Sequence, residues 1–390
     1  GSALSVAVGD IAIDSGGGLG EPRIRGAQAG ARPPGEPHLP RNCPGPRNGV
    51  DVRALSLTGE RTIAVQDKPE PEPGPGELLI RLRASAICGS DLHLYRRAPQ
   101  AYIDRAITPG HEGSGDVVAV GEGVMGWAPG DRAVVYFRRT CWECDDCRSG
   151  NNQVCAVIRP GYGFGAHGSD AELMTADASA SMRLPDGLSA REGSILACQG
   201  GTAYAPLVRL GVGGRDRVAV SGLGPVGLLA AQFALAMGAE VVGIDPVAER
   251  RALAESLGAS ATIDPTAGDV GPALKAIWPR GADKLVEASG ATPAHEAIPA
   301  VVRPRGTAAL VGLGTEPFQT SLNGITRWDI NLFGSTIYPQ IMWDELCDFV
   351  QRKSIDLGAV VSHDLSIEEG SQGFRLADEA ASGKICFHFD

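Results

Sequence analysis

The 390-residue sequence lacks two features that would each mark a particular class of protein. It has no uninterrupted apolar run close to the roughly 20 residues that a membrane helix needs. Glycine, glutamine or charge interrupts the longest candidates, around Val218–Val220 and Leu228–Met237. It also lacks an excess of positive charge, because 46 acidic residues outnumber 35 basic ones and give a formal net charge of −11. Since a surface of that sign repels phosphates, we expect neither a membrane-spanning segment nor a nucleic-acid partner.

A secretory signal and a disulfide framework are missing as well. The opening segment, Gly1–Ile13, has no basic start, and Asp10 interrupts its apolar residues, so it does not match a signal peptide. The nine cysteines are an odd number in a large acidic chain, which favours reduced thiols and metal ligands over disulfides. A cytoplasmic location is the resulting expectation.

The first 49 residues contain neither lysine nor an aromatic side chain and are rich in glycine and proline. Such a segment buries too little apolar surface to offset the entropy lost on ordering, so we predict a flexible extension over residues 1–51. The whole chain has ordinary globular composition, with 43% hydrophobic and 21% charged residues. Its length fits two domains, each with its own core.

Two patterns of hydrophobicity divide the remainder. From residue 52 to about residue 205 short strands bounded by glycine are expected, among them 77–87, 116–120 and 132–136. Alternation in the first of these places apolar residues on one face and polar residues on the other: Arg81, Arg83 and Ser85. After about residue 215, strands alternate with helices, beginning with a strand at 217–221 and a helix at 225–237. The sequence therefore predicts an α/β protein with a partly closed β-barrel and a doubly wound parallel sheet.

Four cysteines lie on one short stretch: Cys141, Cys144, Cys147 and Cys155. Thiolates at this spacing can surround one tetrahedral Zn²⁺ and leave no open position, which is typical of structural zinc. Two disulfides or a thiol-redox pair are the alternatives. A nucleic-acid-binding zinc ribbon is disfavoured by three acidic residues inside the loop: Glu143, Asp145 and Asp146.

A second set of metal-ligand residues is dispersed along the chain. Cys88 lies in Ile-Cys-Gly-Ser-Asp-Leu-His, His111 in Pro-Gly-His-Glu, and Cys198 in Leu-Ala-Cys-Gln-Gly. Each alone is weak evidence, because a single cysteine or histidine is more often simply packed. Together they offer two thiolates and an imidazole, which leave the fourth position of a zinc ion free for water or a substrate oxygen.

A glycine-rich segment follows the strand at 217–221 and opens the next helix; its residues include Gly222, Gly224, Pro225 and Gly227. That context is typical of a dinucleotide-binding turn, in which the glycines allow a tight turn and close approach of the pyrophosphate. Asp245 ends the next strand, where a carboxylate binds the ribose hydroxyls and repels a 2′-phosphate. We therefore expect NAD rather than NADP. Arg250 would soften this preference if it faced the ribose instead of solvent.

Together these motifs resemble the zinc-dependent medium-chain alcohol dehydrogenase family, from about residue 52 to the end of the chain. The resemblance implies three structural regions: a GroES-like catalytic domain over 52–205, a Rossmann cofactor domain over 206–342, and a return to the catalytic domain over 343–390.

The resemblance also implies roles for the residues of the dispersed set. The catalytic zinc would be held by Cys88, His111 and Cys198, with Glu112 as an alternating or outer ligand. Asp91 would orient the imidazole of His111, which fixes its tautomer. Ser90 would take the proton from the alcohol and His93 would pass it to water, a surface histidine being the alternative for His93.

Further contacts are implied at the cofactor and the substrate. Thr202 and Val226 would pack on the nicotinamide, and Lys384 would lie near the pyrophosphate. Tyr136 and Phe137 would form a wall of the substrate pocket.

The reaction that this set of residues implies is the reversible oxidation of an alcohol to an aldehyde or ketone, in which Zn²⁺ polarises the substrate oxygen and the nicotinamide takes the hydride. A polyol, sugar or amino-alcohol dehydrogenase on the same scaffold is the nearer alternative. A non-catalytic, cofactor-binding regulatory protein is the remote one, because the set of zinc ligands is complete. We expect a small-molecule alcohol or carbonyl substrate and a homodimer or homotetramer.

Overall fold

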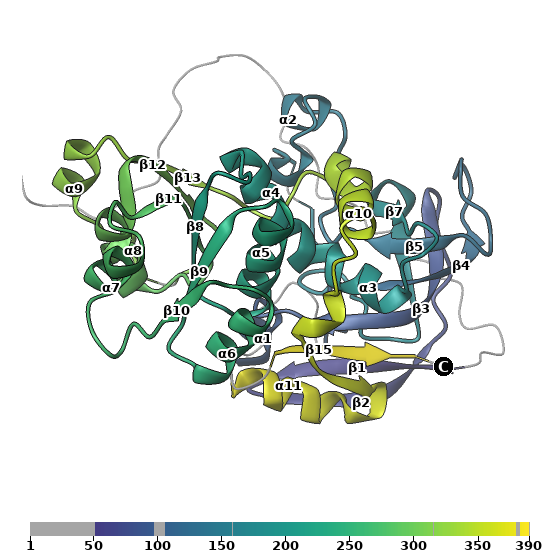
Figure 1. The fold of residues 1–390 in the computed structure, drawn as a ribbon. Coiled ribbons are helices and arrows are strands. Elements are labelled where there is room, and N and C mark those ends of the chain that lie inside the picture. The colour runs from purple at the N-terminus through teal and green to yellow at the C-terminus, as the bar shows by residue number, and fades with distance from the viewer. Residues whose placement is uncertain (1–50, 97–105, 158, 315, 380–382, 390) are drawn as a thin grey trace, which may run out of the picture. The chain divides into compact units, whose positions relative to one another are not determined.

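A computed structural model of the protein describes residues 51–96, 106–157, 159–314, 316–379 and 383–389 (Figure 1). All of them belong to a compact unit that spans residues 48–390. The flexible extension predicted for residues 1–51 therefore lies, except for its last residue, outside the described part of the chain. Among the described residues, no helix combines the length and the apolarity needed to cross a membrane.

The first half of this unit is built from antiparallel strands. The first two strands form a hairpin: β1 (Asp51–Gly59) and β2 (Thr62–Pro69). The next five belong to one sheet: β3 (Glu77–Ile87), β4 (Ser114–Val120), β5 (Arg132–Val135), β6 (Leu173–Asp177) and β7 (Ser181–Arg183). Strand β3 pairs with both β4 and β6, and the order continues through β5 to β7. Short helices α1 (Asp91–Arg96) and α2 (Asp145–Arg148) interrupt the connections, together with the 3₁₀ turns 152–154 and 178–180.

Strand β3 corrects one detail of the predicted alternation. Arg81 and Arg83 are exposed as expected, but Ser85 is fully buried. The reason is that residues 169 and 170 lie against its side chain, with Ser169 Oγ 2.8 Å from Ser85 Oγ. The Ser85 hydroxyl there donates to Asp170 Oδ1 at 2.7 Å.

A parallel sheet forms the second half, in the order β10-β9-β8-β11-β12-β13. Its strands are β8 (Arg217–Ser221), β9 (Glu240–Ile244), β10 (Ala261–Ile263), β11 (Ala282–Glu287), β12 (Val302–Leu310) and β13 (Asn331–Gly334). Its helices are α5 (Pro225–Ala236), α6 (Ala248–Ser256), α7 (Val270–Ile277), α8 (Thr292–Val301) and α9 (Leu322–Arg327).

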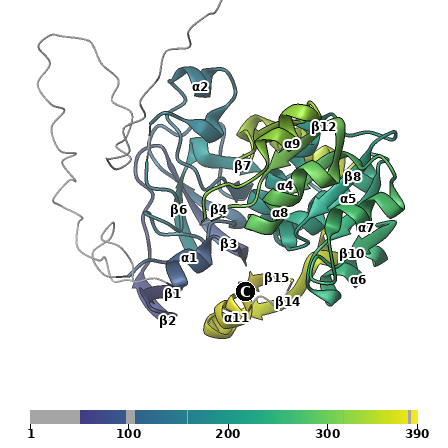
Figure 2. The same ribbon diagram turned by 90° about the vertical axis from the view of Figure 1, so that its left-hand side faces the viewer.

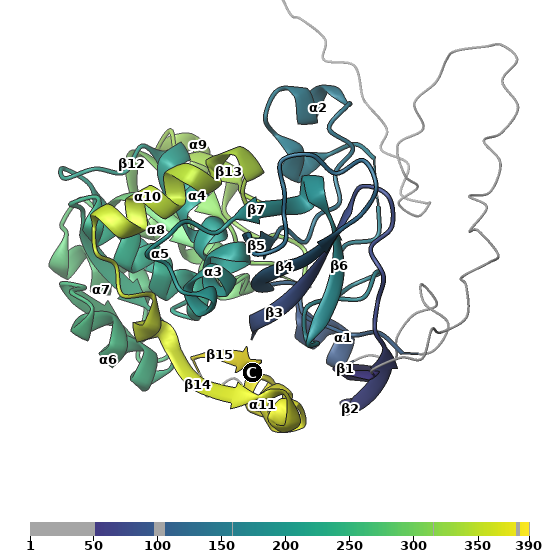
Figure 3. The same ribbon diagram turned by 90° about the vertical axis from the view of Figure 1, so that its right-hand side faces the viewer.

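Helices cover both faces of this sheet, as the views in Figures 2 and 3 show. Alternate residues of β8 face different cores: Val218 and Val220 pack in the cluster that contains α5, and Ala219 packs in the cluster that contains α7 and α8. Burial on both faces is typical of a parallel sheet with helical crossovers. The predicted doubly wound sheet is confirmed.

A continuous helical segment joins the two halves: α3 (Ala190–Ile195), a π-helical turn (Leu196–Gly200) and α4 (Gly201–Leu210). Ser189 and Glu192 form a reciprocal capping box at its start. The segment ends at Gly211, whose φ of 63° suits glycine at a helix C-terminus.

The C-terminal residues return to the sheet of the first half. After a 3₁₀ turn at 340–342, the elements are α10 (Trp343–Arg352), a 3₁₀ turn (Leu357–Val360), β14 (Val361–Ser366), a 3₁₀ turn (Ile367–Glu369), α11 (Gly370–Asp378) and β15 (Lys384–His388). Strand β15 lies between β14 and β3 and runs antiparallel to β3. This pairing places Lys384, the first residue of β15, beside the end of β3.

Candidate functional site

Two groups of metal-ligating side chains are assembled within the described residues. In each group the candidate donor atoms lie within 4.8 Å of one another: Cys88, His111, Glu112 and Cys198 in the first, and Cys141, Cys144, Cys147 and Cys155 in the second. The structure therefore brings together both sets that the sequence singled out. We call them the mixed cluster and the four-cysteine cluster.

The mixed cluster draws its donors from three segments. Cys88 follows the last residue of β3, His111 and Glu112 precede β4, and Cys198 lies on the π-helical turn between α3 and α4. Turns of that kind occur frequently at functional sites. His111 and Glu112 are almost completely buried, and Cys198 is 7% exposed.

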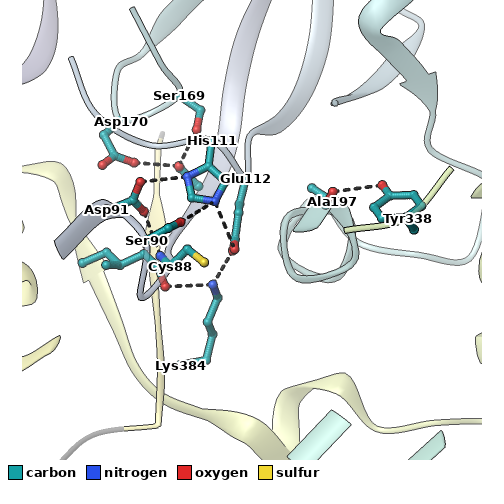
Figure 4. A network of polar contacts seen from close by, with 12 residues as sticks. Cys88, Ser90, Asp91, His111, Glu112, Ser169, Asp170, Ala197, Tyr338 and Lys384 are labelled. Atoms are coloured by element: carbon teal, nitrogen blue, oxygen red, sulfur yellow. Dashed lines mark hydrogen bonds and ion pairs between the residues drawn. The ribbon is translucent and has the colours of Figure 1, made fainter. Parts of the chain in front are cut away.

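The imidazole of His111 is held in one orientation (Figure 4). Its Nδ1 lies 2.7 Å from Asp91 Oδ1, and the other oxygen of Asp91 accepts the Cys88 backbone N–H at 2.8 Å. Because the carboxylate accepts, Nδ1 carries the proton and Nε2 keeps its lone pair for a metal ion. Asp91 thus has the geometry expected for an orienting residue.

Glu112 is paired with Lys384 in the same buried region. The amino group of Lys384 contacts Glu112 Oε2 and donates to the Ile87 carbonyl oxygen at 2.8 Å, and both charged side chains are fully buried. Strand β15 thus carries Lys384 to the end of β3, and the expectation that it lies near the pyrophosphate stays a prediction. The second carboxylate oxygen of Glu112, Oε1, is buried, makes no hydrogen bond to any described residue and lies 4.0 Å from His111 Nε2.

Burial and neighbouring charge shift the titration of these groups. Burial raises the pKa of Glu112 to about 8 although Lys384 opposes the shift. A hydrogen bond from Cys198 is the largest of several effects that hold the pKa of Cys88 well below its usual value. Two soft thiol ligands, an imidazole nitrogen and a spare carboxylate oxygen at one point form a donor set that fits zinc.

Cys198 is positioned by a chain of buried tyrosines. Tyr338 donates its hydroxyl to the Ala197 carbonyl oxygen at 2.9 Å, and Tyr136 donates to the Tyr338 carbonyl oxygen at 2.6 Å. Both rings are buried. The Tyr136 ring centroid lies 6.2 Å from that of Phe137. The expected place of Tyr136 in the wall of the substrate pocket stays a prediction.

Two further aromatic rings pack against His111. Phe137 and Phe164 have ring centroids 5.1 and 4.9 Å from the His111 ring, and 5.7 Å from each other. Both phenylalanines are partly exposed. The role of Phe137 in the substrate pocket stays a prediction. The sequence gives no sign of Phe164, because the irregular glycine-rich loop around it has no periodicity.

The predicted proton-relay residues lie at the start of α1. Ser90 Oγ is 3.5 Å from His111 Nε2. His93 lies on α1 and is exposed. Thr202, on α4, has a buried hydroxyl without a described partner. Their roles in the reaction remain predictions.

The four-cysteine cluster is a local structure around α2. The Cys141 sulfur lies 3.9 Å from that of Cys147 and 3.5 Å from that of Cys155, and all four thiols are free of disulfides. Backbone N–H groups of Glu143 and Cys144 point at the Cys141 sulfur and lower its pKa to about 6. Such a set of thiolates fits a closed zinc site.

The glycine-rich segment has the backbone that a dinucleotide requires. Gly222 has a φ of +86°, a side chain at Gly227 would collide with the Gly222 carbonyl oxygen, and Gly224 faces open space. Helix α5 starts at Pro225, so its free N–H groups point toward that space. Val226 follows and is partly exposed.

Asp245 lies beside this turn at the end of β9. Its two oxygens accept the N–H groups of Leu223 and Val247 at 2.7 and 2.8 Å. Arg250 Nη1 is 3.8 Å from the same carboxylate. A cavity of about 850 Å³ is lined by Gly222, Gly224, Asp245, Arg250 and residues of α7 and α8, which fits the adenosine part of a dinucleotide.

Known proteins share this architecture. Residues 74–186 match the family described as alcohol dehydrogenase GroES-like domain, and residues 225–352 match zinc-binding dehydrogenase. Sorbitol dehydrogenase of Halalkalibacterium halodurans is 31% identical over 86% of this chain and 98% of its own length. L-Threonine 3-dehydrogenase of Enterobacter sp. strain 638 is 31% identical over 87% of this chain and all of its own. The structure of alcohol dehydrogenase TADH from Thermus sp. ATN1 has a TM-score of 0.78 at 29% identity, covering 86% of this chain and 99% of that one.

The chain therefore belongs to the zinc-dependent medium-chain dehydrogenase family. It is an oxidoreductase of the alcohol dehydrogenase type, with a GroES-like domain and a Rossmann domain.

Proposed function

We propose that the protein is a zinc-dependent, NAD-preferring dehydrogenase that interconverts an alcohol and its carbonyl product at the mixed cluster. The observation that carries the proposal is the convergence of Cys88, His111 and Cys198 beside two phenylalanine rings. Zinc bound there would supply a Lewis acid that lowers the pKa of the substrate hydroxyl.

The protein's own residues supply orientation and proton transfer. Asp91 fixes the tautomer of His111. Ser90, whose hydroxyl lies near His111 Nε2, receives the substrate proton, and exposed His93 passes it to solvent. Phe137 and Phe164 pack against the His111 ring and exclude water from that side of the mixed cluster.

The cofactor preference rests on Asp245. Its buried carboxylate stands beside the phosphate turn, where it accepts ribose hydroxyls and repels a 2′-phosphate. Arg250 is close enough to that carboxylate to reduce the repulsion but does not remove the charge. We therefore propose NAD as the better cofactor.

Two phenylalanines favour an alcohol with an apolar carbon skeleton, because a polyol needs hydrogen-bond partners for each hydroxyl. A polyol or amino-alcohol substrate is the second candidate, favoured by the names of the sorbitol and threonine dehydrogenases that the chain resembles.

A panel of alkyl and aryl alcohols, polyols, L-threonine and their carbonyl products, assayed with NAD and NADP, tests the proposal. We expect the highest kcat/KM for an apolar alcohol with NAD, and Asp245→Ser should narrow or reverse the preference over NADP. If the protein holds two zinc ions and still turns over none of these compounds, the proposed reaction is contradicted. An enzyme that already prefers NADP would contradict the role of Asp245.

A further inference from the structure

Strand β11 ends in a buried carboxylate that the proposed chemistry does not use. Glu287 is fully buried, and its Oε1 accepts the Ser289 N–H at 2.8 Å, the Gly290 N–H at 3.1 Å and the Ser289 hydroxyl. Burying a charge is costly unless hydrogen bonds compensate it. The donors gathered here all belong to residues just after the strand, so the carboxylate organises the turn over residues 288–291.

A histidine on α8 holds the other side of this carboxylate. His295 Nε2 lies 3.2 Å from Glu287 Oε2, and the imidazole is 6% exposed. Because a carboxylate can only accept, Nε2 carries the proton. The ring also packs on Phe318, with centroids 5.0 Å apart. His295 Nδ1 is buried and has no hydrogen-bond partner among the described residues, so the contact to Glu287 is the polar interaction that the structure gives this side chain.

The turn that Glu287 organises lies directly against the phosphate-binding turn. A side chain at Gly222 would come within 2.7 Å of Ser289 N, and one at Gly290 within 2.7 Å of the Leu313 backbone. Ser289 also lines the 850 Å³ cavity together with Gly222 and Gly224. The position of residues 288–291 therefore sets how far Gly222 can move.

We infer that Glu287 and His295 are a positioning pair that keeps the dinucleotide site preformed, an inference that rests on the proposed use of a nicotinamide cofactor. A preformed site binds more tightly because less ordering is required when the ligand arrives. Neither residue belongs to either zinc cluster. Loss of the pair should therefore weaken cofactor binding and leave the hydride-transfer step at saturating cofactor unchanged.

Two substitutions at one position separate the hydrogen bond from the shape of the ring. His295→Phe keeps an aromatic ring for Phe318 and removes the donor, whereas His295→Gln supplies a donor without the ring. With the zinc-loaded protein, NADH fluorescence titration should show about tenfold weaker binding for His295→Phe. The KM for NAD should rise in parallel, with kcat within about twofold of wild type. His295→Gln should bind NADH within about threefold of wild type, and His388→Leu, at an exposed position of β15, is the matched control.

Three results would overturn the inference. They are an unchanged NADH affinity in His295→Phe, a loss of NADH affinity in His295→Gln as large as that in His295→Phe, or a fall in the kcat of His295→Phe without a change in its NADH affinity. If His295→Phe does not fold, Ser289→Ala removes another donor to Glu287 and must weaken NADH binding for the inference to stand. Wild-type protein that binds neither NADH nor NADPH would instead overturn the proposed function, and the role of the pair with it.

Discussion

The four-cysteine cluster takes all its donors from residues 141–155, whereas the mixed cluster gathers its donors from the end of β3, the loop before β4 and the π-helical turn. The first needs only a local loop to form. The second exists only when the sheet that contains β3 and β4 and the helical segment 190–210 have packed together. A defect in packing should therefore damage the mixed cluster first.

The electrostatic surroundings of the two clusters also differ, because one is stabilised locally and the other by distant parts of the chain. Backbone N–H groups stabilise the thiolate of Cys141, which is partly exposed. Around the mixed cluster, buried ionisable side chains compensate one another, as Lys384 does for Glu112. Buried ion pairs are costly to break. The local site is thus independent of its surroundings, and the assembled site depends on them.

The sharpest test of the comparison is the loss of one thiol from the mixed cluster. Cys198→Ser should lower kcat/KM by about 10³-fold at every pH, because the substrate oxygen loses its electrophile. Zinc content should fall from two ions per chain to one, and the melting temperature should change little. These quantities are measured by steady-state kinetics, elemental analysis and calorimetry. Retention of both ions with full activity would remove Cys198 from the ligand set.

How much of each cluster the sequence reveals follows from the same difference. The spacing from Cys141 to Cys155 predicts a shared metal because the chain between the thiols is too short to separate them. Cys88, His111 and Cys198 can be grouped from the sequence only as residue types that suit an open zinc site, because no local pattern places β3 beside the π-helical turn.

The strands and helices of the parallel sheet were predictable for a similar reason: hydrophobic periodicity is local. The contacts that the sequence does not reveal are long-range. Lys384 contacts Glu112 because β15 pairs with β3, which the sequence does not encode locally. The hydrogen bond from Tyr136 to the Tyr338 carbonyl oxygen likewise joins residues far apart in the chain.

Removing the buried cation should show how strongly the mixed cluster depends on charge compensation. Lys384→Met leaves Glu112 buried without its partner and should cost about 3–5 kcal/mol of unfolding free energy when Glu112 is charged. Because the pKa of Glu112 is raised to about 8, the cost should be larger at pH 9 than at pH 6. Denaturant unfolding at both pH values measures it, and Lys384→Met combined with Glu112→Gln should recover most of the loss. A cost that did not vary with pH would show that Lys384 contributes packing alone.

The four-cysteine cluster should respond in the opposite way. Cys141→Ser should remove one zinc ion and lower the melting temperature by about 5–10 °C, because a structural metal contributes folding free energy. The folded fraction should keep kcat/KM within about threefold of wild type. Loss of activity as complete as in Cys198→Ser, at a temperature where the variant is folded, would contradict the division into a structural and a catalytic site.

The smallest expected effect concerns Asp170, a buried carboxyl group behind the mixed cluster. Burial, reinforced by the charge of Asp91, raises the pKa of Asp170 to about 7, and its Oδ2 has no hydrogen-bond partner among the described residues. An unfolded chain loses this proton near pH 4. Between about pH 4 and 7 the folded state binds more protons, so this group's contribution to stability falls as the pH rises.

Asp170→Asn retains an acceptor for the Ser85 hydroxyl and cannot ionise. We therefore expect the melting temperature of the variant, relative to wild type, to rise from pH 5 to about pH 7 and then to level off, by a few degrees in all. Asp145→Asn, at an exposed position beside the four-cysteine cluster, is the control that should show no such trend. If the difference in melting temperature between Asp170→Asn and wild type does not change with pH, Asp170 is ionised throughout this range. The network behind His111 would then be anionic at neutral pH.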